Sequence, residues 1–303
     1  MKKGGDGRKL HGITPPVATP LTLAEEPDLP RLRWFIDHLL AGGIHAVFVL
    51  GTNSEFYAFT EAEKQQVMAT AVAHVAGRVP VLVGTGAETT REAIRLTRLA
   101  EREGADAVSV ITPYFIQPSQ AELIEHYRRI ADSTRLPVVI YSNPAHTGVR
   151  IAPETVERLA ELPQIVAIKD SSGDLQTTID YLRLSGGRLG VFQGRDTLIL
   201  PSLLMGAVGA VAASANVAPR LCADLYAAWE RGDWPAAKAA QQRLHPVRQC
   251  LALATPPAGV KAALRLLGID LGPSAAPLAE PPPANLELMR ASLTAAGLAP
   301  ADR

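Results

Sequence analysis

The chain has 303 residues, of which 47 % are apolar and 20 % charged, with 30 lysines and arginines against 30 aspartates and glutamates. This apolar fraction excludes an intrinsically disordered chain, which lacks the apolar surface needed to offset chain entropy. A formal charge of zero gives no long-range attraction to phosphate backbones or anionic lipids, and no local basic patch stands out. We therefore expect a globular protein that binds small neutral or anionic molecules and neither nucleic acid nor membrane.

The N-terminal segment and the cysteines favour a cytoplasmic protein. Residues 1–11 are basic, but no apolar segment with a small-residue cleavage site follows them. No window reaches the roughly 20 apolar residues of a membrane span. We therefore predict a flexible tail over 1–11, without an export signal or a membrane span. Two cysteines, Cys222 and Cys250, make no disulfide framework in a chain of this length, which is typical of a reducing compartment.

From the tail to residue 231, short apolar runs alternate with longer amphipathic stretches, the pattern of parallel β/α units. Most runs are continuous rather than alternating, as in strands covered on both faces. Eight strands and eight helices in roughly 220 residues predict a TIM barrel over 12–231, with a doubly wound open sheet as the alternative. The helical sequence over 232–303 predicts an added C-terminal domain. The runs are 13–19, 45–50, 80–84, 107–111, 137–141, 165–169, 189–193 and 209–213.

Three helix starts carry the pattern of a capping box, in which a hydroxyl and a carboxylate each accept a hydrogen bond from the other residue's backbone N–H. We expect a helix to begin directly after each hydroxyl residue. The pairs are Thr60 with Glu63, Thr89 with Glu92, and Ser119 with Glu122.

Lys169 closes the apolar run IVAI at a predicted strand end, where the active site of a TIM barrel forms. Strand parity directs it into the barrel together with Ala167 and Ile165. A lysine held out of water there favours its neutral amine, a nucleophile that can form a Schiff base with a carbonyl. Tyr141 closes the preceding predicted strand, where its hydroxyl can carry protons. The alternatives are a lysine that packs its stem and exposes its head, and a tyrosine that fills core space.

The segment GTNSEF presents Thr52, Asn53 and Ser54, whose hydroxyls and backbone N–H groups can hold a carboxylate or phosphate. The alternative is a loop with local turn hydrogen bonds. His146 follows the fifth run and is positioned to contact a substrate oxygen. The histidines show no HxH or HExxH spacing and no G-x-S-x-G segment is present, so we predict neither a metal site nor a serine nucleophile.

From about residue 12 to the helical tail, the chain resembles the dihydrodipicolinate synthase and N-acetylneuraminate lyase superfamily of pyruvate-dependent class I aldolases. The matching segments include GITPPVATPL, GTNSEF and IKDSSGD. The Y-x-x-P-x-x-T-G element is present as Tyr141, Pro144, Thr147 and Gly148. Further similar segments are GTGAETTREAI, ADAVSVITPYFIQPSQ and GRDTLILPSLLMGAVGAVAASANVAP.

The resemblance implies that Lys169 forms an imine with pyruvate or another 2-oxo acid and that Tyr141 shuttles protons. Thr52 would link Tyr141 to solvent, and the backbone N–H groups of Thr52 and Asn53 would hold the substrate carboxylate. Backbone atoms near Val211 would line the pocket opposite. The imine serves as the electron sink, so no organic cofactor or metal is implied. The family also implies a homotetramer built as a dimer of dimers.

Three departures from the synthase pattern concern selectivity and proton transfer. The synthase has two adjacent tyrosines where this chain has Tyr114 and Phe115, so the hydroxyl that crosses a subunit interface to complete the proton relay is missing. His146 stands where the synthase has an arginine for aspartate semialdehyde, and histidine lacks the permanent charge and fork of arginine. Asn53 and Ser54 replace a threonine and a glycine in the carboxylate loop.

We therefore predict a Schiff-base lyase that adds pyruvate to an aldehyde or cleaves the aldol, with a 2-keto-3-deoxy sugar acid or a related aldol as the favoured substrate. One alternative is 4-hydroxy-tetrahydrodipicolinate (dihydrodipicolinate) synthase, which uses pyruvate and aspartate semialdehyde. A hydratase-aldolase or a dehydratase acting through the same imine is another. From other classes, the candidates are a barrel that binds a 2-oxo acid without turnover and a metal-dependent barrel enzyme.

Overall fold

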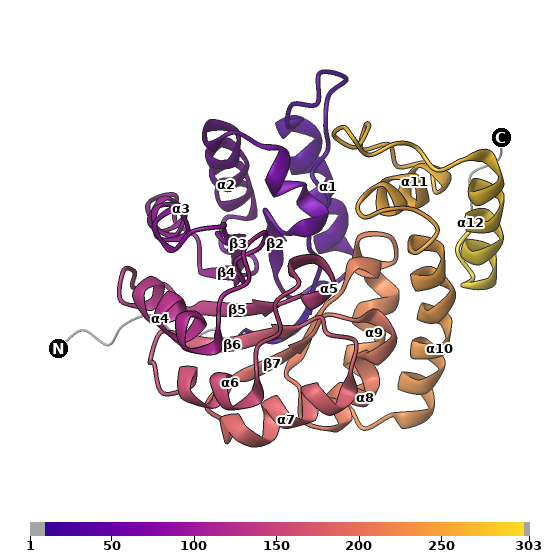
Figure 1. The fold of residues 1–303 in the computed structure, drawn as a ribbon. Coiled ribbons are helices and arrows are strands. Elements are labelled where there is room, and N and C mark those ends of the chain that lie inside the picture. The colour runs from indigo at the N-terminus through magenta and orange to yellow at the C-terminus, as the bar shows by residue number, and fades with distance from the viewer. Residues whose placement is uncertain (1–9, 300–303) are drawn as a thin grey trace.

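The computed structural model describes residues 10–299, so most of the tail predicted over 1–11 lies outside the described residues. Eight parallel strands form one sheet in the order β1-β8-β7-β6-β5-β4-β3-β2, with helices around it (Figure 1). A parallel bridge between Pro16 and Phe48 joins the edges next to β1 and β2, and the Val17 N–H donates to the Phe48 carbonyl at 2.8 Å. The predicted TIM barrel with a C-terminal helical extension is confirmed.

The strands are short, and the first is shorter than its apolar run because Pro15 and Pro16 have no N–H to donate to a ladder. The strands are β1 Gly12–Thr14, β2 Val47–Val49, β3 Val81–Gly84, β4 Ala107–Ile111, β5 Val138–Ser142, β6 Ile165–Asp170, β7 Gly190–Gln193 and β8 Gly209–Val211. The α-helices are α1 Leu29–Ala41, α2 Glu61–Val75, α3 Thr90–Arg102, α4 Gln120–Ala131, α5 Pro144–Thr147, α6 Pro153–Leu159, α7 Leu175–Ser185, α8 Ile199–Leu204, α9 Pro219–Glu230, α10 Trp234–Leu251, α11 Ala258–Leu266 and α12 Pro283–Ala295.

Side-chain capping sets the start of all three predicted helices, which begin directly after Thr60, Thr89 and Ser119. Thr60 before α2 and Ser119 before α4 each form both halves of a capping box. The capping box predicted at α3 is only half formed, because Thr89 accepts from the Glu92 N–H but its own N–H does not donate to the Glu92 carboxylate. That carboxylate instead holds Arg95, one turn further along the helix, at 2.6 Å.

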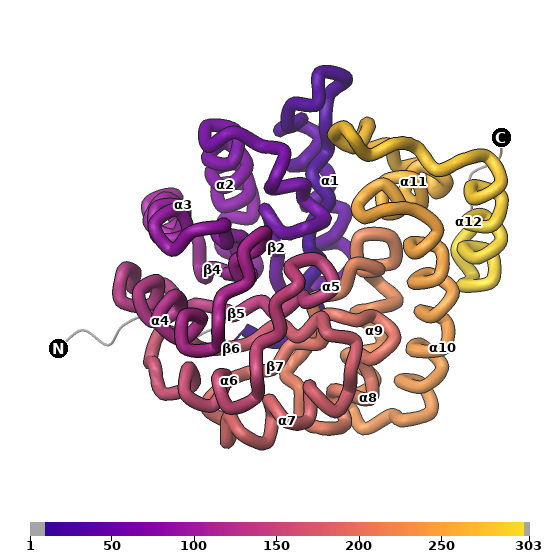
Figure 2. Tube along the Cα trace, viewed as in Figure 1, coloured from indigo at the N-terminus to yellow at the C-terminus, as the bar shows by residue number. Residues whose placement is uncertain are grey.

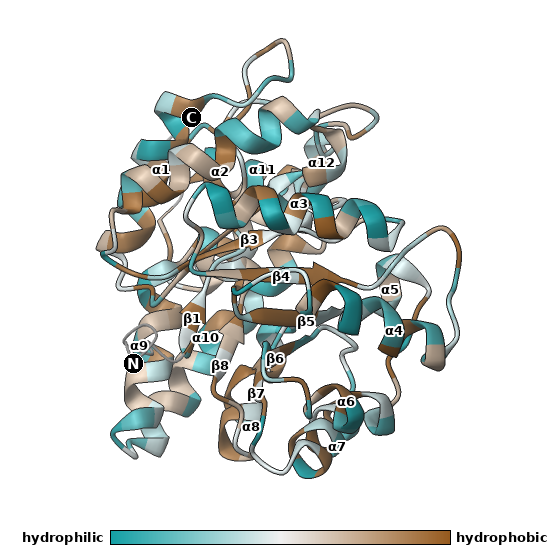
Figure 3. Ribbon diagram, turned by 90° about the vertical axis from the view of Figure 1, so that its left-hand side faces the viewer, coloured by the Kyte–Doolittle hydropathy of each residue, from teal (hydrophilic) through white to brown (hydrophobic). Residues whose placement is uncertain are grey.

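Two apolar clusters lie on either side of the strands. The large cluster fills the space between strands and helices, and a small one fills the barrel interior. Figure 3 shows the same division, with hydrophobic strands β4 and β5 beneath the mixed hydrophilic surface of α3. The interior cluster is Ala46, Phe48, Leu82, Ala107, Val139, Ala167, Phe192 and Val211.

The interior cluster corrects one prediction about β6. Ala167 faces the barrel interior as expected, but Ile165 packs in the outer cluster. The cause is a register shift in which Val138 pairs with Ile165 while the next residue, Val139, pairs with Ala167. One residue of β6, Val166, therefore has no partner on β5 and forms a β-bulge. The bulge interrupts the alternation of side chains, so Ile165 points away from the barrel interior.

The chain after the eighth strand is helical. Helix α10 packs along α9 and against α12, and α11 lies near the C-terminal ends of the strands (Figures 1 and 2). Helix α9 ends at Glu230 and α10 begins at Trp234, which brackets the predicted boundary between barrel and extension. Within residues 10–299, no helix is both long and apolar enough to cross a membrane.

Candidate active site

Lys169 and Tyr141 are neighbours across the β5–β6 ladder, because their Cα atoms are register partners. The Lys169 Nζ lies 3.6 Å from the centroid of the Tyr141 ring and 5.2 Å from that of Phe48. Only 4 % of Lys169 is exposed. Among the ion pairs formed by the described residues, none involves this lysine. Lysine is rarely buried unless its charge is paired. Lys169 faces two aromatic rings, so a structural ion pair does not account for its burial.

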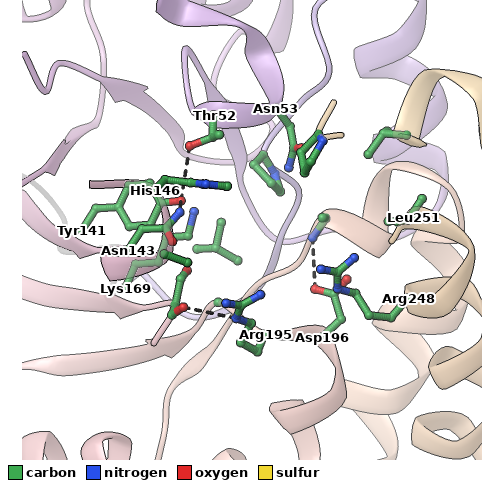
Figure 4. Close-up of a pocket in the computed structure, with 18 residues that line it drawn as sticks. Thr52, Asn53, Tyr141, Asn143, His146, Lys169, Arg195, Asp196, Arg248 and Leu251 are labelled. Carbon is green, nitrogen blue, oxygen red and sulfur yellow. Dashed lines mark hydrogen bonds between the residues drawn. The ribbon is translucent and has the colours of Figure 1, made fainter. Parts of the chain in front are cut away.

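The Tyr141 hydroxyl lies at the centre of a short hydrogen-bond chain. Asn143 Nδ2 donates to it at 2.9 Å, and Thr52 Oγ1 lies 3.4 Å away (Figure 4). Burial raises the pKa of this phenol, but the positive charge of Lys169 and hydrogen bonds from Thr52, Lys169 and Asn143 outweigh it, so the pKa is lowered below 10.0. The environment therefore favours the phenolate more than water does, which suits a group that gives and takes protons.

Thr52 and Asn53 begin a single 3₁₀ turn, Thr52–Ser54, that follows β2. The first N–H groups of a helical turn have no partner within it. A buried hydrogen bond holds the turn against the segment after β1: Ser54 Oγ donates to the Val17 carbonyl. Both Thr52 and Asn53 line the cavity described below.

Glu55 ties this loop to the C-terminal extension. Its Oε1 lies 2.7 Å from Lys261 Nζ on α11, and the two side chains are 0 % and 3 % exposed. Glu55 Oε2 also accepts from the Ala275 N–H at 2.6 Å, and Lys261 donates to the Pro273 carbonyl at 2.6 Å. Burial lowers the pKa of Lys261 although Glu55 acts in the opposite direction. The loop that carries Thr52 is thus held by residues from the far end of the chain.

The residues after Lys169 support the end of β6. The Asp170 carboxylate accepts from the Ser172 N–H at 2.9 Å and from Thr178 Oγ1 at 2.7 Å, which anchors the first turns of α7. Asp174 is the N-cap of that helix, and its side chain accepts from the Gln176 N–H. These contacts assign Asp170 a structural role.

The ends of β7 and β8 complete the wall beside Lys169. A side chain at Gly194 would place its Cβ 2.0 Å from Ser171 Oγ, so only glycine lets the two loops approach. Arg195 follows, and its Nε donates to the Ser171 carbonyl at 3.2 Å. Asp196 is 2 % exposed, and its carboxylate accepts from Ser214 N–H and hydroxyl groups and from a neighbouring N–H.

These elements enclose a cavity of about 140 Å³. Of the residues singled out in the sequence, six line it: Thr52, Asn53, Tyr141, His146, Lys169 and Val211. Five polar residues that the sequence analysis did not select also line it: Ser171 and, labelled in Figure 4, Asn143, Arg195, Asp196 and Arg248. Asn143 was detectable, since it lies two residues after Tyr141 and therefore on the same side of the chain. Arg248 lies on α10, and nothing in its local sequence places that helix over the barrel.

His146 is a titratable residue of the cavity whose ring is neutral. Burial lowers its pKa below 6.5, and the positive charges of Arg195 and Lys169 lower it further. The ring is therefore uncharged at pH 7, so one ring nitrogen donates a hydrogen bond and the other accepts one.

Tyr114 and Phe115 are not among the residues that line the cavity within one chain. Phe115 is 90 % exposed and adopts a left-handed φ of 72° in the loop between β4 and α4. Tyr114 packs edge-on against Phe56, with ring centroids 6.3 Å apart, and burial beside Glu88 raises the pKa of its hydroxyl.

Several known proteins are similar to this chain in sequence and in fold. Residues 9–296 match the Dihydrodipicolinate synthetase family. A 4-hydroxy-tetrahydrodipicolinate synthase of Thermomicrobium roseum is 39 % identical over 284 residues, which cover 94 % of each chain. The pyruvate-bound, chloride-inhibited dihydrodipicolinate synthase of Acinetobacter baumannii has a TM-score of 0.93 and 31 % identity over 96 % of this chain and all of that one. YagE of E. coli K12, a protein of the same family also in complex with pyruvate, has a TM-score of 0.91 and 33 % identity over 95 % of this chain and 99 % of its own.

Proposed function

This chain belongs to the dihydrodipicolinate synthetase family, and from that premise we propose how its own residues carry out the chemistry. The protein is a pyruvate-dependent lyase of the class I aldolase type. The observation that supports the mechanism is the register pairing of Lys169 with Tyr141, in which an amine and a phenol lie side by side in a buried cavity.

In this mechanism the neutral amine of Lys169 attacks C2 of pyruvate, and the resulting carbinolamine loses water to give an imine. Loss of a proton from C3 gives an enamine, whose C3 forms a bond to an aldehyde carbon while the aldehyde oxygen takes up a proton. Water then hydrolyses the imine, which releases the product and frees the amine. Tyr141 is the group that moves these protons, with Thr52 as the link toward solvent, which its 3.4 Å separation supports.

The substrate carboxylate would bind the backbone N–H groups of Thr52 and Asn53. Backbone near Val211 would line the opposite side, and His146 would contact a substrate oxygen as a neutral ring. This orientation directs C2 of pyruvate toward the Lys169 nitrogen. Positioning of this kind lowers the barrier by removing translational and rotational freedom before reaction.

For the second substrate, we propose an aldehyde that yields a 2-keto-3-deoxy sugar acid or a related aldol. The absence of an arginine at position 146 supports this choice. The second candidate, 4-hydroxy-tetrahydrodipicolinate synthase acting with aspartate semialdehyde, is favoured by the name of the Thermomicrobium roseum relative. The two arginines in the cavity wall weaken the argument from His146, since an arginine from another element can serve the same purpose.

The quaternary state and cellular location are part of the same proposal. Phe115 and Ile116 are 90 % and 71 % exposed, and two large apolar side chains in one loop support a subunit contact there. We expect a cytoplasmic homotetramer, built as a dimer of dimers. Light scattering checks the mass, and Phe115→Ser should shift the protein toward smaller species if this loop lies at a contact.

Borohydride reduction tests the imine mechanism. The protein is reduced with and without pyruvate, and the product is read by intact mass and peptide mapping. We expect a pyruvate adduct on Lys169 and none in Lys169→Ala. No adduct with pyruvate or with longer 2-oxo acids would contradict the mechanism and favour a binding protein without turnover.

A further inference from the structure

A second, smaller cavity lies beside the reaction cavity, and the mechanism above does not use it. Its volume is about 10 Å³, close to the roughly 10–15 Å³ that one buried water needs. Thr52 and Tyr141 line both cavities, and the rest of the small cavity is lined by residues of β2, β3 and β4 and the segments that follow β2 and β3. The two residues of the proposed proton path therefore border a space of the size of one water molecule.

Ser109 contributes a buried hydroxyl to this small cavity. It pairs in register with Gly84 on β3 and with Val139 on β5. Val139 lies in the interior cluster, and register partners point to the same side of a sheet, so Ser109 faces the barrel interior. The residue is 3 % exposed, and within residues 10–299 its Oγ has no hydrogen-bond partner. Because a buried hydroxyl without a partner is costly, we expect a bound molecule to supply one.

Closely packed backbone encloses the small cavity on the β3 side. A Cβ at Gly84 would lie 1.9 Å from the Leu50 carbonyl oxygen, and a Cβ at Gly86 would lie 2.4 Å from Ile111 Cγ2. Leu50 itself adopts a left-handed φ of 56°, which a leucine rarely does. Such a conformation persists only where the surrounding structure enforces it. The segment that leads to Thr52 is therefore pressed against β3, and the space beside Ser109 has fixed walls.

The Thr52 hydroxyl has one hydrogen-bonding capacity that the chain does not use. Asn143 Nδ2 donates to the Tyr141 hydroxyl, so the hydrogen of the phenol is left for Thr52 Oγ1 at 3.4 Å (Figure 4). In the described part of the chain, this is the only hydrogen bond of the Thr52 hydroxyl. A hydroxyl donates as well as accepts, so Thr52 still has a hydrogen to donate when Tyr141 is protonated. An acceptor in the small cavity would receive it.

We propose that one water, bound by Ser109, occupies the small cavity and orients the Thr52 hydroxyl. The inference rests on the proposed function, because it concerns the proton steps of Tyr141. When Tyr141 is protonated, it donates to Thr52 Oγ1, and Thr52 donates to the water. When Tyr141 has given its proton to the substrate, Thr52 donates to the phenolate oxygen and accepts from the water. Only the proton that Tyr141 exchanges with the substrate changes its oxygen.

Ser109 is a positioning residue in this account, because it acts on Tyr141 through the water and Thr52. Its hydroxyl both donates and accepts, so it can hold the water in either arrangement. A crystal structure that shows ordered water elsewhere in the core tests the site itself. We expect one water within about 3.2 Å of both Ser109 Oγ and Thr52 Oγ1. Its absence from the wild type would overturn the proposal.

The functional test measures how fast the C3 hydrogens of pyruvate exchange for deuterium in D₂O. This exchange needs the imine and the enamine but no aldehyde, so it isolates the proton steps. Ser109→Thr and Ser109→Val have the same shape and differ by one hydroxyl, and Ser109→Ala decides the test if these two variants do not fold. Thr97→Val on α3 is the matched control, since Thr97 Oγ1 lies 2.9 Å from Thr85 Oγ1 in a buried pair.

Ser109→Val and Ser109→Ala should lower the exchange rate by about 3- to 10-fold, the size of one hydrogen bond, and leave KM for pyruvate unchanged. Ser109→Thr and Thr97→Val should stay within about twofold of the wild type. Equal rates in Ser109→Val and Ser109→Thr, or a wild-type rate in Ser109→Ala, would overturn the proposal. Borohydride trapping separates the two levels of the account: a wild type that forms no adduct with pyruvate would refute the proposed function instead.

Discussion

The two walls of the cavity come from different kinds of structure. Lys169 and Tyr141 stand on adjacent strands, where backbone hydrogen bonds fix their separation. Arg248, Leu251 and Val260 stand on helices added after the barrel. Hydrogen bonds between the strands fix the spacing of Lys169 and Tyr141. A side chain on a helix outside the sheet can be substituted without disturbing those hydrogen bonds. The barrel strands therefore carry the two residues of the proposed imine chemistry, and the extension supplies the opposite wall of the cavity.

The two regions are joined at one buried contact. The loop that carries Thr52 belongs to the barrel, yet Glu55 at its end pairs with Lys261 of the extension. The two walls are therefore not independent: if the extension moves, the Thr52–Ser54 turn loses its support. Substitutions on each side of this contact show how far the division holds.

The largest effect is expected at Lys169. Lys169→Ala removes the nucleophile, so kcat/KM should fall by about 10³-fold or more. Lys169→Arg keeps the charge and should be equally inactive, because a guanidinium does not form the imine. The rate of the aldol reaction is measured as the rate at which pyruvate is consumed. Activity within tenfold of the wild type in either variant would break the assignment of chemistry to the barrel strands.

Tyr141→Phe should lower kcat by about 10²- to 10³-fold, the usual contribution of a positioned proton carrier. The matched control is Tyr127→Phe, since Tyr127 is fully buried in the outer core and its hydroxyl donates to the Val110 carbonyl at 3.1 Å. That variant should lose about 1 kcal/mol of stability and little activity. Equal losses of kcat in both variants would indicate that tyrosine packing, not the Tyr141 hydroxyl, matters.

Lys261→Met should lower the free energy of unfolding by about 3–5 kcal/mol, because it leaves the Glu55 carboxylate buried and unpaired. The double variant Glu55→Gln with Lys261→Met should recover part of that loss. Chemical denaturation measures the stabilities, and KM for pyruvate reports on the Thr52 turn. If Lys261→Met matches the wild type in stability and in KM for pyruvate, the loop does not depend on the extension.

The smallest expected effect lies on the barrel's outer side, away from both walls. His126 is 4 % exposed, its Nδ1 lies 2.9 Å from Thr90 Oγ1, and burial followed by the charge of Arg129 lowers its pKa to about 4. The unfolded chain, with an ordinary pKa of about 6.5, binds this proton first, so stability is full above pH 6.5 and falls toward pH 4 by about 3 kcal/mol. His126→Asn should remove that part of the pH dependence and leave activity at pH 7 unchanged. Denaturation at several pH values checks this, and an unchanged slope would contradict it.

Local sequence predicts the barrel wall better than the extension wall. Lys169 and Tyr141 end continuous apolar runs, and the ends of parallel strands lie on one face, so their proximity follows from strand pairing alone. The register shift that turns Ile165 outward has no such local signal. The local sequence also does not predict that Arg248 lines the cavity, because its position there depends on how α10 packs against α9.

The assignment of the imine chemistry to the barrel strands is tested most directly by borohydride trapping of the wild type, Lys169→Ala and Arg248→Met with pyruvate. Intact mass measures the pyruvate adduct, and peptide mapping locates it. The account predicts no adduct in Lys169→Ala and as much adduct in Arg248→Met as in the wild type. An adduct in Lys169→Ala, or loss of the adduct in Arg248→Met, would contradict it.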